Sequence, residues 1–289
     1  MRRSFLLVIL AALAAAPAAH ATLPGGNGRI AAAGVIGGGD DITKALVTLP
    51  ADRAGRGRQT KFLRECTRVD GQPEEGSDCD AEYRSPAWAP NGRRLIFDAG
   101  RSLALLNANR SGFKLLPASS GDDSDPAFSP SGRQIAFNAR TGRTQAVRVR
   151  SVDGGSARRL AARASAPDWS RRNRIAFVRG GTIFSVKPNG RGLDRIARGQ
   201  DPSWSPSGRS IAFSRANGIY VARADGSRAR RVVRCRGCDT PVFSPDGKLL
   251  VIDFKGLRTV RASNGRLVRK LIDDVRGASD FSEPAWQPR

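Results

Sequence analysis

The stretch PSWSPSGRSIAF, residues 202–213, contains the pieces of one strand, a tight turn and a second strand. Variants of this stretch recur along the chain. The copies begin at Pro86, Pro126, Pro167, Pro202, Pro241 and Pro284, with spacings of 40, 41, 35, 39 and 43 residues. A period near 40 residues with turn signals inside each unit is typical of proteins built from repeated four-stranded sheets.

Each of the first five copies predicts the same order of strands. An aromatic residue ends the first strand, a turn with glycine follows, and an apolar segment such as Ile211-Ala212-Phe213 forms the second strand. A third strand, for example 218–221, is followed by a pair such as Asp225-Gly226 and then by a fourth strand. Such pairs supply the positive φ that tight hairpins require. We call these strands A to D and predict an all-β, six-bladed β-propeller of four-stranded antiparallel blades.

The two ends of the chain are predicted to share one blade. Residues 27–31 resemble the turn and strand B of a unit that has no strand A, and 284–289 resemble a strand A with nothing after it. Blade 1 is therefore expected to comprise 27–63 and 284–289, and pairing of the two segments would cover the open sheet edges. Residues 64–85 are expected to be an insertion within a single domain, 22–289. The other blades are expected to start near residues 86, 126, 167, 202 and 241.

The repeats resemble the P-x-W-S-P-D-G-x-x-I-A-F units of TolB-like six-bladed propellers. The resemblance covers residues 27–289 and concerns the propeller part only, with no counterpart of the Tol amino-terminal domain. Asp246 keeps the acidic turn residue of the family pattern, and Ser170-Arg171-Arg172 replaces the Ser-Pro step in one unit. The resemblance implies that the mouth of the central channel is a docking surface for a partner.

The N-terminal residues predict export. Arg2 and Arg3 precede an apolar run from Phe5 to Ala19, and small residues surround a cleavage position after Ala21. This order is typical of a secretory signal peptide, 1–21. An uncleaved membrane anchor is the alternative, but a spanning helix needs about 20 apolar residues. We expect a secreted protein, or one of the periplasm or cell envelope, with no membrane span.

Four cysteines follow the signal segment, and an oxidising compartment favours disulfides. Two local pairs are expected, Cys66 with Cys79 and Cys235 with Cys238, because the pairs fall in well-separated loops. A four-thiolate zinc site is the alternative, since a C-x-x-C element can contribute to one.

The residue types available for catalysis are few. The only histidine, His20, lies in the signal segment, so the exported chain has no histidine base or histidine metal ligand. No G-x-S-x-G nucleophile elbow occurs. We predict that the protein is not an enzyme. A polysaccharide lyase or a carboxylate-only glycosidase is the alternative, because two Asp or Glu residues suffice for the latter.

One aromatic residue per repeat occupies the same position, at the end of strand A. Because every unit has it, we expect these residues to pack between neighbouring sheets, with ligand stacking as the alternative. They are Trp88, Phe128, Trp169, Trp204, Phe243 and Trp286.

The formal charge of +23 is unevenly distributed along the sequence. The expected D-to-A connections hold 16 acidic and 8 basic residues, whereas the rest of the exported chain holds 39 basic and 10 acidic residues. These connections are 64–85, 118–125, 161–166, 198–201, 234–240 and 273–283. They should share one face, so we predict an acidic channel mouth on a basic body. The excess of Arg over Lys, 42 to 7, has a simpler explanation in a GC-rich genome.

The residues just before the repeat prolines, Ala166 among them, are expected to ring the channel mouth, with Asp122, Asp123 and Asp239 close by. The predicted binding residues are Ser85, Asp125, Asp201, Asp239, Thr240 and Glu283. We expect a monomeric scaffold that binds a protein or peptide there and has no cofactor. The alternatives are that the carboxylate oxygens hold Ca²⁺ or that they only cap turns. An adhesin that binds anionic envelope polymers through the basic body is a further alternative. Nucleic acid is not expected as a partner, because the chain is exported and shows no recognition helix.

Overall fold

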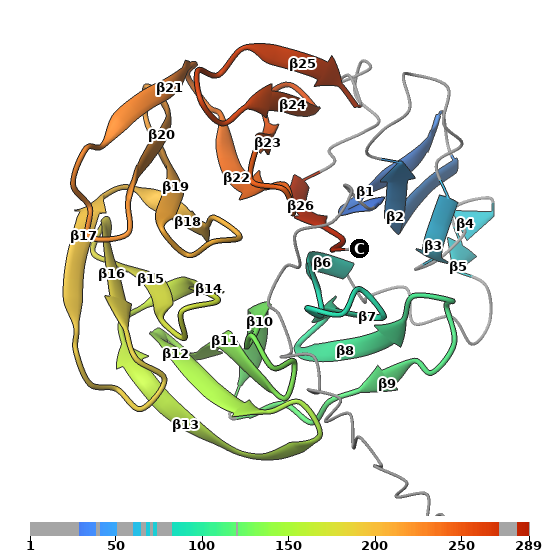
Figure 1. Cartoon of the computed structure of the whole chain (residues 1–289). Coiled ribbons are helices and arrows are strands. Elements are labelled where there is room, and N and C mark those ends of the chain that lie inside the picture. The colour runs from blue at the N-terminus through green and yellow to red at the C-terminus, as the bar shows by residue number, and fades with distance from the viewer. Residues whose placement is uncertain are drawn as a thin grey trace, which may run out of the picture.

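The structure is a computed structural model that describes residues 29–38, 41–50, 60–64, 68–69, 72–73, 83–119, 121–271 and 282–288. Within these ranges six four-stranded antiparallel sheets surround a central axis, and no helix occurs. Figure 1 shows the sheets as blades of one ring. The predicted β-propeller fold is confirmed. No helix in the described ranges is long and apolar enough to cross a membrane.

Five blades follow one another along the chain, each with its strands in the order A to D from the axis outward. Blade 2 contains β6 (Tyr83–Trp88), β7 (Arg94–Ala99), β8 (Ser102–Asn107) and β9 (Lys114–Leu115). Blade 3 contains β10 (Asp122–Phe128), β11 (Gln134–Thr141), β12 (Thr144–Ser151) and β13 (Gly154–Ala162). Blade 4 contains β14 (Ser165–Trp169), β15 (Ile175–Arg179), β16 (Thr182–Val186) and β17 (Asp194–Arg198). Blade 5 contains β18 (Gln200–Trp204), β19 (Ser210–Arg215), β20 (Gly218–Arg223) and β21 (Arg230–Arg234). Blade 6 contains β22 (Asp239–Phe243), β23 (Leu249–Asp253), β24 (Leu257–Arg261) and β25 (Leu267–Lys270).

Blade 1 joins the two ends of the described chain, as predicted. Its sheet has the order β26 (Ser282–Trp286), β1 (Arg29–Gly38), β2 (Asp41–Pro50) and β3 (Thr60–Arg64). Strand β26 pairs with β1 through Ile30 and Trp286, so the last strand supplies the innermost position of the first blade. A separate hairpin of β4 (Arg68–Val69) and β5 (Gln72–Pro73) lies in the connection to blade 2.

Neighbouring blades pack through apolar clusters. The strand-B residues Phe97, Phe137, Phe177 and Phe213 occupy equivalent positions and are fully buried. The A–B turns also approach one another closely. Gly92 has a φ of 64°, and a Cβ there would lie 2.3 Å from the carbonyl oxygen of Pro288, so glycine is required where blade 2 meets the C-terminal segment.

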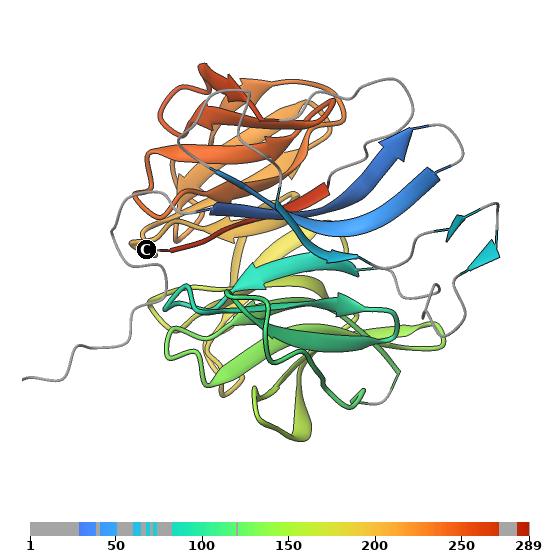
Figure 2. The ribbon, with the colours of Figure 1, turned by 90° about the vertical axis from the view of Figure 1, so that its right-hand side faces the viewer.

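The meander places the loops on two opposite faces. The A–B and C–D connections share the face that carries Pro288, and this face points toward the viewer in Figure 1. In Figure 2 the C-terminal end of the chain lies at the left and the β4–β5 hairpin lies at the right. We call the face that carries Pro288 the basic face, for reasons given below. Its described connections are 89–93, 108–113, 129–133, 152–153, 170–174, 187–193, 205–209, 224–229, 244–248 and 262–266. The B–C and D–A connections form the other face, which we call the mouth face.

One of the two expected disulfides lies in the described part of the chain. Cys235 and Cys238 are bonded in the D–A connection between blades 5 and 6, with Cα atoms 5.9 Å apart. Both side chains are buried in the same cluster as Phe243. Cys66, Cys79 and the expected signal peptide, 1–21, lie outside the described residues.

Candidate functional site

The innermost strands of the six blades surround a cavity of about 360 Å³. It extends from the residues before the repeat prolines, on the mouth face, to the A–B turn residues Pro90, Arg171 and Ser205 near the basic face. Between these two ends, its wall consists of the six repeat prolines, the six repeat aromatic residues and the residues between them. The cavity is therefore an axial channel with a mostly apolar wall and few charged groups.

Four of the predicted mouth residues line this channel: Ser85, Asp125, Asp201 and Thr240. Ala166, at the equivalent position of blade 4, lines it as well. Asp239 does not belong to the lining and is exposed one residue before Thr240. The side chain of Glu283 lies outside the described residues.

The mouth residues share an unusual backbone conformation. Their φ values are 46° for Ser85, 51° for Asp125, 49° for Ala166, 48° for Asp201 and 42° for Thr240. Each is followed by proline, and each lies where the pairing of strands A and B shifts register. Positive φ is uncommon for residues other than glycine, and bulges redirect side chains at functional sites. In the five blades whose mouth residue is described, the repeat therefore changes the direction of one side chain at the channel mouth.

Hydrogen bonds hold the mouth carboxylates in place. The Ser85 hydroxyl donates to a carboxylate oxygen of Asp125 at 3.0 Å, which links blades 2 and 3. The backbone N–H of Asp125 donates to the Asp98 carboxylate, also at 3.0 Å. In blade 5 the Ser214 hydroxyl donates to Asp201 at 2.7 Å. Both mouth carboxylates thus accept a hydrogen bond from a neutral serine hydroxyl group, which orients them.

Asp122 and Asp123, expected near the mouth, have other contacts. Asp122 forms ion pairs with Arg101 at 2.7 Å and Arg140 at 3.4 Å, and the hydrogen bond from Arg101 lowers its pKa. Asp123 is buried and accepts hydrogen bonds from the hydroxyl and backbone N–H of Ser119; burial raises its pKa. Neither residue lines the channel, and their contacts instead join the start of β10 to neighbouring residues.

Asp168 is a channel residue that the sequence analysis did not single out. The equivalent positions in the other blades hold Ala, Ser or Val. Its carboxylate accepts the backbone N–H of Trp204 from the next blade at 2.5 Å. The side chain is partly exposed to the channel, but the carboxylate is withdrawn from bulk water, and this burial raises its pKa to about 6. The sequence could have indicated this residue, because Asp168 is the sole carboxylate at this repeat position.

Because the pKa of Asp168 is higher in the folded state, the folded protein binds the carboxyl proton of Asp168 more tightly than the unfolded chain does. The resulting stabilisation is fully present below the unfolded pKa, near 3.9, and is lost as pH rises through about 6. We expect Asp168→Asn to remove about 2 to 3 kcal/mol of pH dependence in the free energy of unfolding between pH 4 and 7. Urea unfolding of both proteins across this range measures the difference. Parallel pH profiles would show that Asp168 titrates normally.

The six repeat aromatics are buried, with exposed fractions of 8% or less. Each belongs to an apolar cluster between neighbouring sheets, and each also contributes to the channel wall. The indole of Trp169 donates to Asn173 at 3.0 Å. Among the described residues, the indole N–H groups of Trp204 and Trp286 have no hydrogen-bond acceptor.

The described residues contain no group of three His, Cys, Asp or Glu side chains that could hold a metal ion. Asp125 and Asp201 belong to blades separated by blade 4, and each has its own serine partner. We therefore derive no role for Ca²⁺ at the mouth.

A closed ring of four-stranded sheets around an axial channel is the architecture of a β-propeller. No protein-family model matches the sequence. A TolB homolog from Chlorobium luteolum is 31% identical over 173 residues, which are 54% of this chain and 31% of that protein. The crystal structure of TolB from Acinetobacter baumannii superposes with a TM-score of 0.68 at 18% identity, covering 91% of this chain and 67% of TolB. The chain is thus a β-propeller that is similar in sequence to part of a TolB homolog and shares the fold of TolB.

The chain spans about a third of the length of the curated relative that it matches. The fold is also shared with an oligogalacturonate lyase in complex with manganese, at a TM-score of 0.54 and 12% identity, covering 79% of this chain and 72% of the lyase. Because the same fold supports unrelated activities, the function of this chain must be argued from its own site.

Proposed function

We propose that the protein is an exported, non-catalytic scaffold that docks a protein or peptide partner at the mouth of its channel. The observation that carries this proposal is the charge of the channel lining. Its charged members are Asp125, Asp168, Asp201 and Arg171, and the three carboxylates lie toward the mouth or inside the channel while the guanidinium lies at the A–B turns. Within the channel, a ligand that enters from the mouth therefore meets carboxylates before it meets the guanidinium.

The chemistry of the wall indicates the kind of partner. Prolines and aromatic rings provide apolar contact, whereas Asp125 and Asp201 provide oriented acceptors at the rim. Binding surfaces commonly combine an apolar centre with a polar rim. An extended peptide with Lys or Arg side chains fits this combination, because its cations can pair with the carboxylates while its apolar parts contact the wall.

Two further D–A connections, 64–85 and 273–283, carry an excess of acidic residues in the sequence. Residues 64–85 contain seven acidic and three basic residues, and 273–283 contain four acidic residues and one basic residue. In the described D–A connections the balance is close to even, with five acidic and four basic residues. A strongly acidic mouth therefore depends on these two segments.

Two features support a binding role over catalysis. The chain after His20 contains no histidine, and the described residues hold no metal-binding cluster that could activate water. The mouth carboxylates accept hydrogen bonds from serine hydroxyls, and they are presented singly on separate blades. The signal-like residues 1–21 support export of the chain to the envelope or beyond.

The test uses a labelled peptide rich in lysine as a probe and measures its affinity by fluorescence anisotropy. We expect Asp125→Asn combined with Asp201→Asn to weaken binding by about tenfold, which corresponds to about 1.4 kcal/mol for two lost charge contacts. Asparagine keeps an oxygen that can accept the hydrogen bonds from Ser85 and Ser214, so thermal stability should change little.

The matched control removes two carboxylates from the opposite face. Asp153 and Asp225 are exposed in C–D connections, and Asp153→Asn with Asp225→Asn changes the net charge by the same amount. We expect peptide affinity to stay within about twofold in this control, since both sites are remote from the mouth and screened by salt. Equal losses in both variants, or no loss in the mouth variant, would place peptide binding elsewhere.

A further inference from the structure

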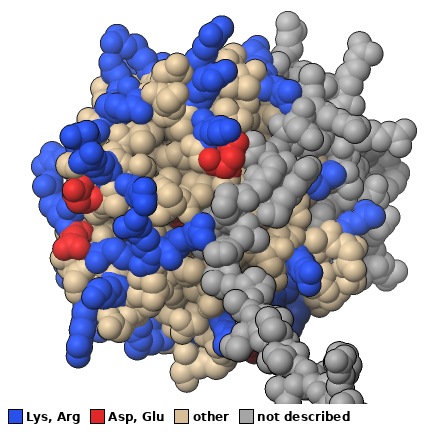
Figure 3. Space-filling model, in the orientation of Figure 1, with Lys and Arg blue, Asp and Glu red and all other residues tan. Residues whose placement is uncertain are grey.

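The face opposite the mouth carries a concentration of cations. Its ten described connections contain 12 Lys and Arg residues and 3 Asp residues, and Figure 3 shows the resulting blue surface. All of these cations except Arg171 and Arg174 are exposed, and the exposed ones form no ion pair within the described part of the chain. Asp225 and Asp246 accept backbone N–H groups of their own turns. This face is therefore strongly positive.

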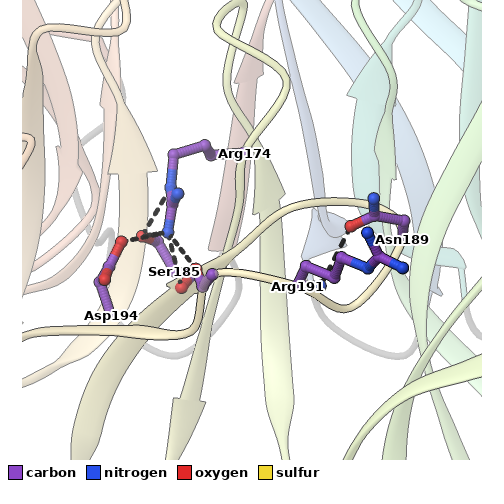
Figure 4. A network of polar contacts seen from close by, with 6 residues as sticks. Arg174, Ser185, Asn189, Arg191 and Asp194 are labelled. Atoms are coloured by element: carbon purple, nitrogen blue, oxygen red, sulfur yellow. Dashed lines mark hydrogen bonds and ion pairs between the residues drawn. The ribbon is translucent and has the colours of Figure 1, made fainter.

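The turns that carry these cations are held in place by hydrogen bonds. Figure 4 shows the example in blade 4, where the guanidinium of Arg174 donates to Ser185 at 2.9 Å, to the carbonyl oxygen of Gly192 at 2.7 Å and to Asp194 at 2.6 Å. The Asn189 side chain accepts the backbone N–H of Arg191 at 3.0 Å in the same turn. Arg191 is thus presented to solvent from a fixed loop, which lowers the entropy cost of binding an anion.

A cavity of about 460 Å³ lies on this face between blades 5 and 6. The A–B turns 205–207 and 245–247 form two of its sides, and Val221 and Phe243 contribute apolar surface. Arg171 marks the axial side, because it also lines the channel, and Arg230, in the outermost strand, marks the peripheral side. The cavity is thus flanked by two guanidinium groups.

Serine hydroxyls and one carboxylate complete the polar lining, with Ser205, Ser207, Ser210, Ser263 and Asp246. Arg230 donates to the carbonyl oxygen of Ser263 at 2.7 Å, which fixes its guanidinium across the two blades. A guanidinium has five N–H donors, so further donors stay available after this bond. Guanidinium forks suit carboxylates, sulfates and phosphates, and hydroxyl groups suit the hydroxyls of sugars.

We infer that the basic face binds an anionic polysaccharide, with one charged sugar unit in the cavity between blades 5 and 6 and the adjoining units across the cationic turns. The cavity has the size of a small-molecule site, and its mixed lining matches a ring that carries both hydroxyls and an acid group. A linear polymer can contact several turns at once and release the counterions of each contacted charge. This surface is separate from the mouth.

A lipid surface is the less favoured partner. The exposed large apolar residues of the described chain are Phe113, Leu115, Leu193, Leu267 and Val268. They lie in or beside the peripheral D strands of three blades and form no apolar patch around the cavity. Membrane association of a folded surface relies on buried apolar area in addition to charge.

The experiment measures binding of sodium alginate, a linear polyuronate, with neutral dextran and vesicles of phosphatidylcholine and phosphatidylglycerol as parallel probes. We expect alginate to bind at 50 mM salt and dextran not to bind. Arg171→Gln combined with Arg230→Gln should weaken alginate binding by about tenfold or more and reduce the slope of log affinity against log salt by about 2.

The matched control, Arg163→Gln with Arg236→Gln, removes two exposed arginines from the mouth face and should leave alginate affinity within about twofold. Ser207→Asp offers a second test that does not alter the arginines. It places a carboxylate at the cavity rim in a turn position where blade 6 has Asp246, so the turn should tolerate it while alginate binding weakens. The mouth variant Asp125→Asn with Asp201→Asn should bind alginate as well as the unaltered protein does.

Three results would overturn this inference. Equal losses in the cavity variant and its control would show attraction by net charge alone. Binding to the vesicles without binding to alginate would identify a lipid surface instead. If circular dichroism shows a folded protein and alginate does not bind at 50 mM salt, the basic face does not bind this class of polysaccharide.

Discussion

A chain that lacks Pro284 to Arg289 is expected to lose its folded monomer. Strand β26 is the innermost strand of blade 1, and its removal exposes the edge of β1. It also removes Trp286, which is 4% exposed and packs against Ile30 of blade 1 and Val251 of blade 6. The loss of this side chain alone should cost about 3 to 5 kcal/mol.

The C-terminal segment also bridges blades 1 and 2 through Gln287. Its backbone N–H donates to the carbonyl oxygen of Arg29 at 2.7 Å, and its side-chain amide donates to that of Gly92 at 2.9 Å. Each such bond contributes about 0.5 to 1.5 kcal/mol. The summed loss is comparable to a total stability of about 5 to 15 kcal/mol, so an open ring with unpaired edges should aggregate. Size-exclusion chromatography and thermal unfolding of the truncated protein measure this outcome.

A rearranged chain serves as the control, because it keeps the residues of β26 but joins them to blade 1 at the other end. In this control, residues 282–289 are moved to precede Asn27, so the chain contains the same residues and the sequence WQPRNGRI joins strand A to strand B directly. In blade 2 the corresponding spacing from Trp88 to Leu95 is the same as that from Trp286 to Ile30 in the rearranged chain. We expect the rearranged chain to fold as a monomer. A truncated protein as stable as the full chain would show that the ring does not close through β26.

The ring itself could be predicted from the sequence because its determinants are local and repeated. Apolar strands and Asn-Gly or Asp-Gly turns at a period near 40 residues define each blade. The incomplete units at the two ends predict that β26 pairs with β1. Four of the predicted mouth residues line the channel for the same reason, since every residue before a repeat proline lies in the first part of the innermost strand.

Other parts of the site depend on contacts between blades, which no local pattern encodes. The residue types at Ser85, Ala166 and Thr240 do not predict their positive φ, because none of these residues is glycine. Burial raises the pKa of Asp168, and the backbone N–H of Trp204 in the next blade, which donates to this carboxylate, lowers it. The cavity beside Arg230 lies between turns of two blades, so its existence follows only from their packing.

Replacement of a single repeat tryptophan is the other change with a large expected effect. Trp204 is 7% exposed and packs with Ile183 of blade 4 and Phe213 of blade 5. Trp204→Ala should lower the free energy of unfolding by about 3 to 5 kcal/mol, because the lost apolar contact leaves a cavity between the two sheets. Urea unfolding monitored by circular dichroism measures this loss.

Conservative variants separate the ring from its N–H group. Phe128 and Phe243 occupy the same repeat position, and among the described residues the indole N–H of Trp204 has no acceptor. Trp204→Phe should therefore lower the free energy of unfolding little beyond the effect of the smaller ring. The indole of Trp169 donates to Asn173 at 3.0 Å, so Trp169→Phe should cost about 1 kcal/mol more than Trp204→Phe does. If Trp204→Ala instead left stability unchanged and abolished peptide binding at the mouth, the aromatic residues of the channel wall would serve the ligand rather than the packing of the blades.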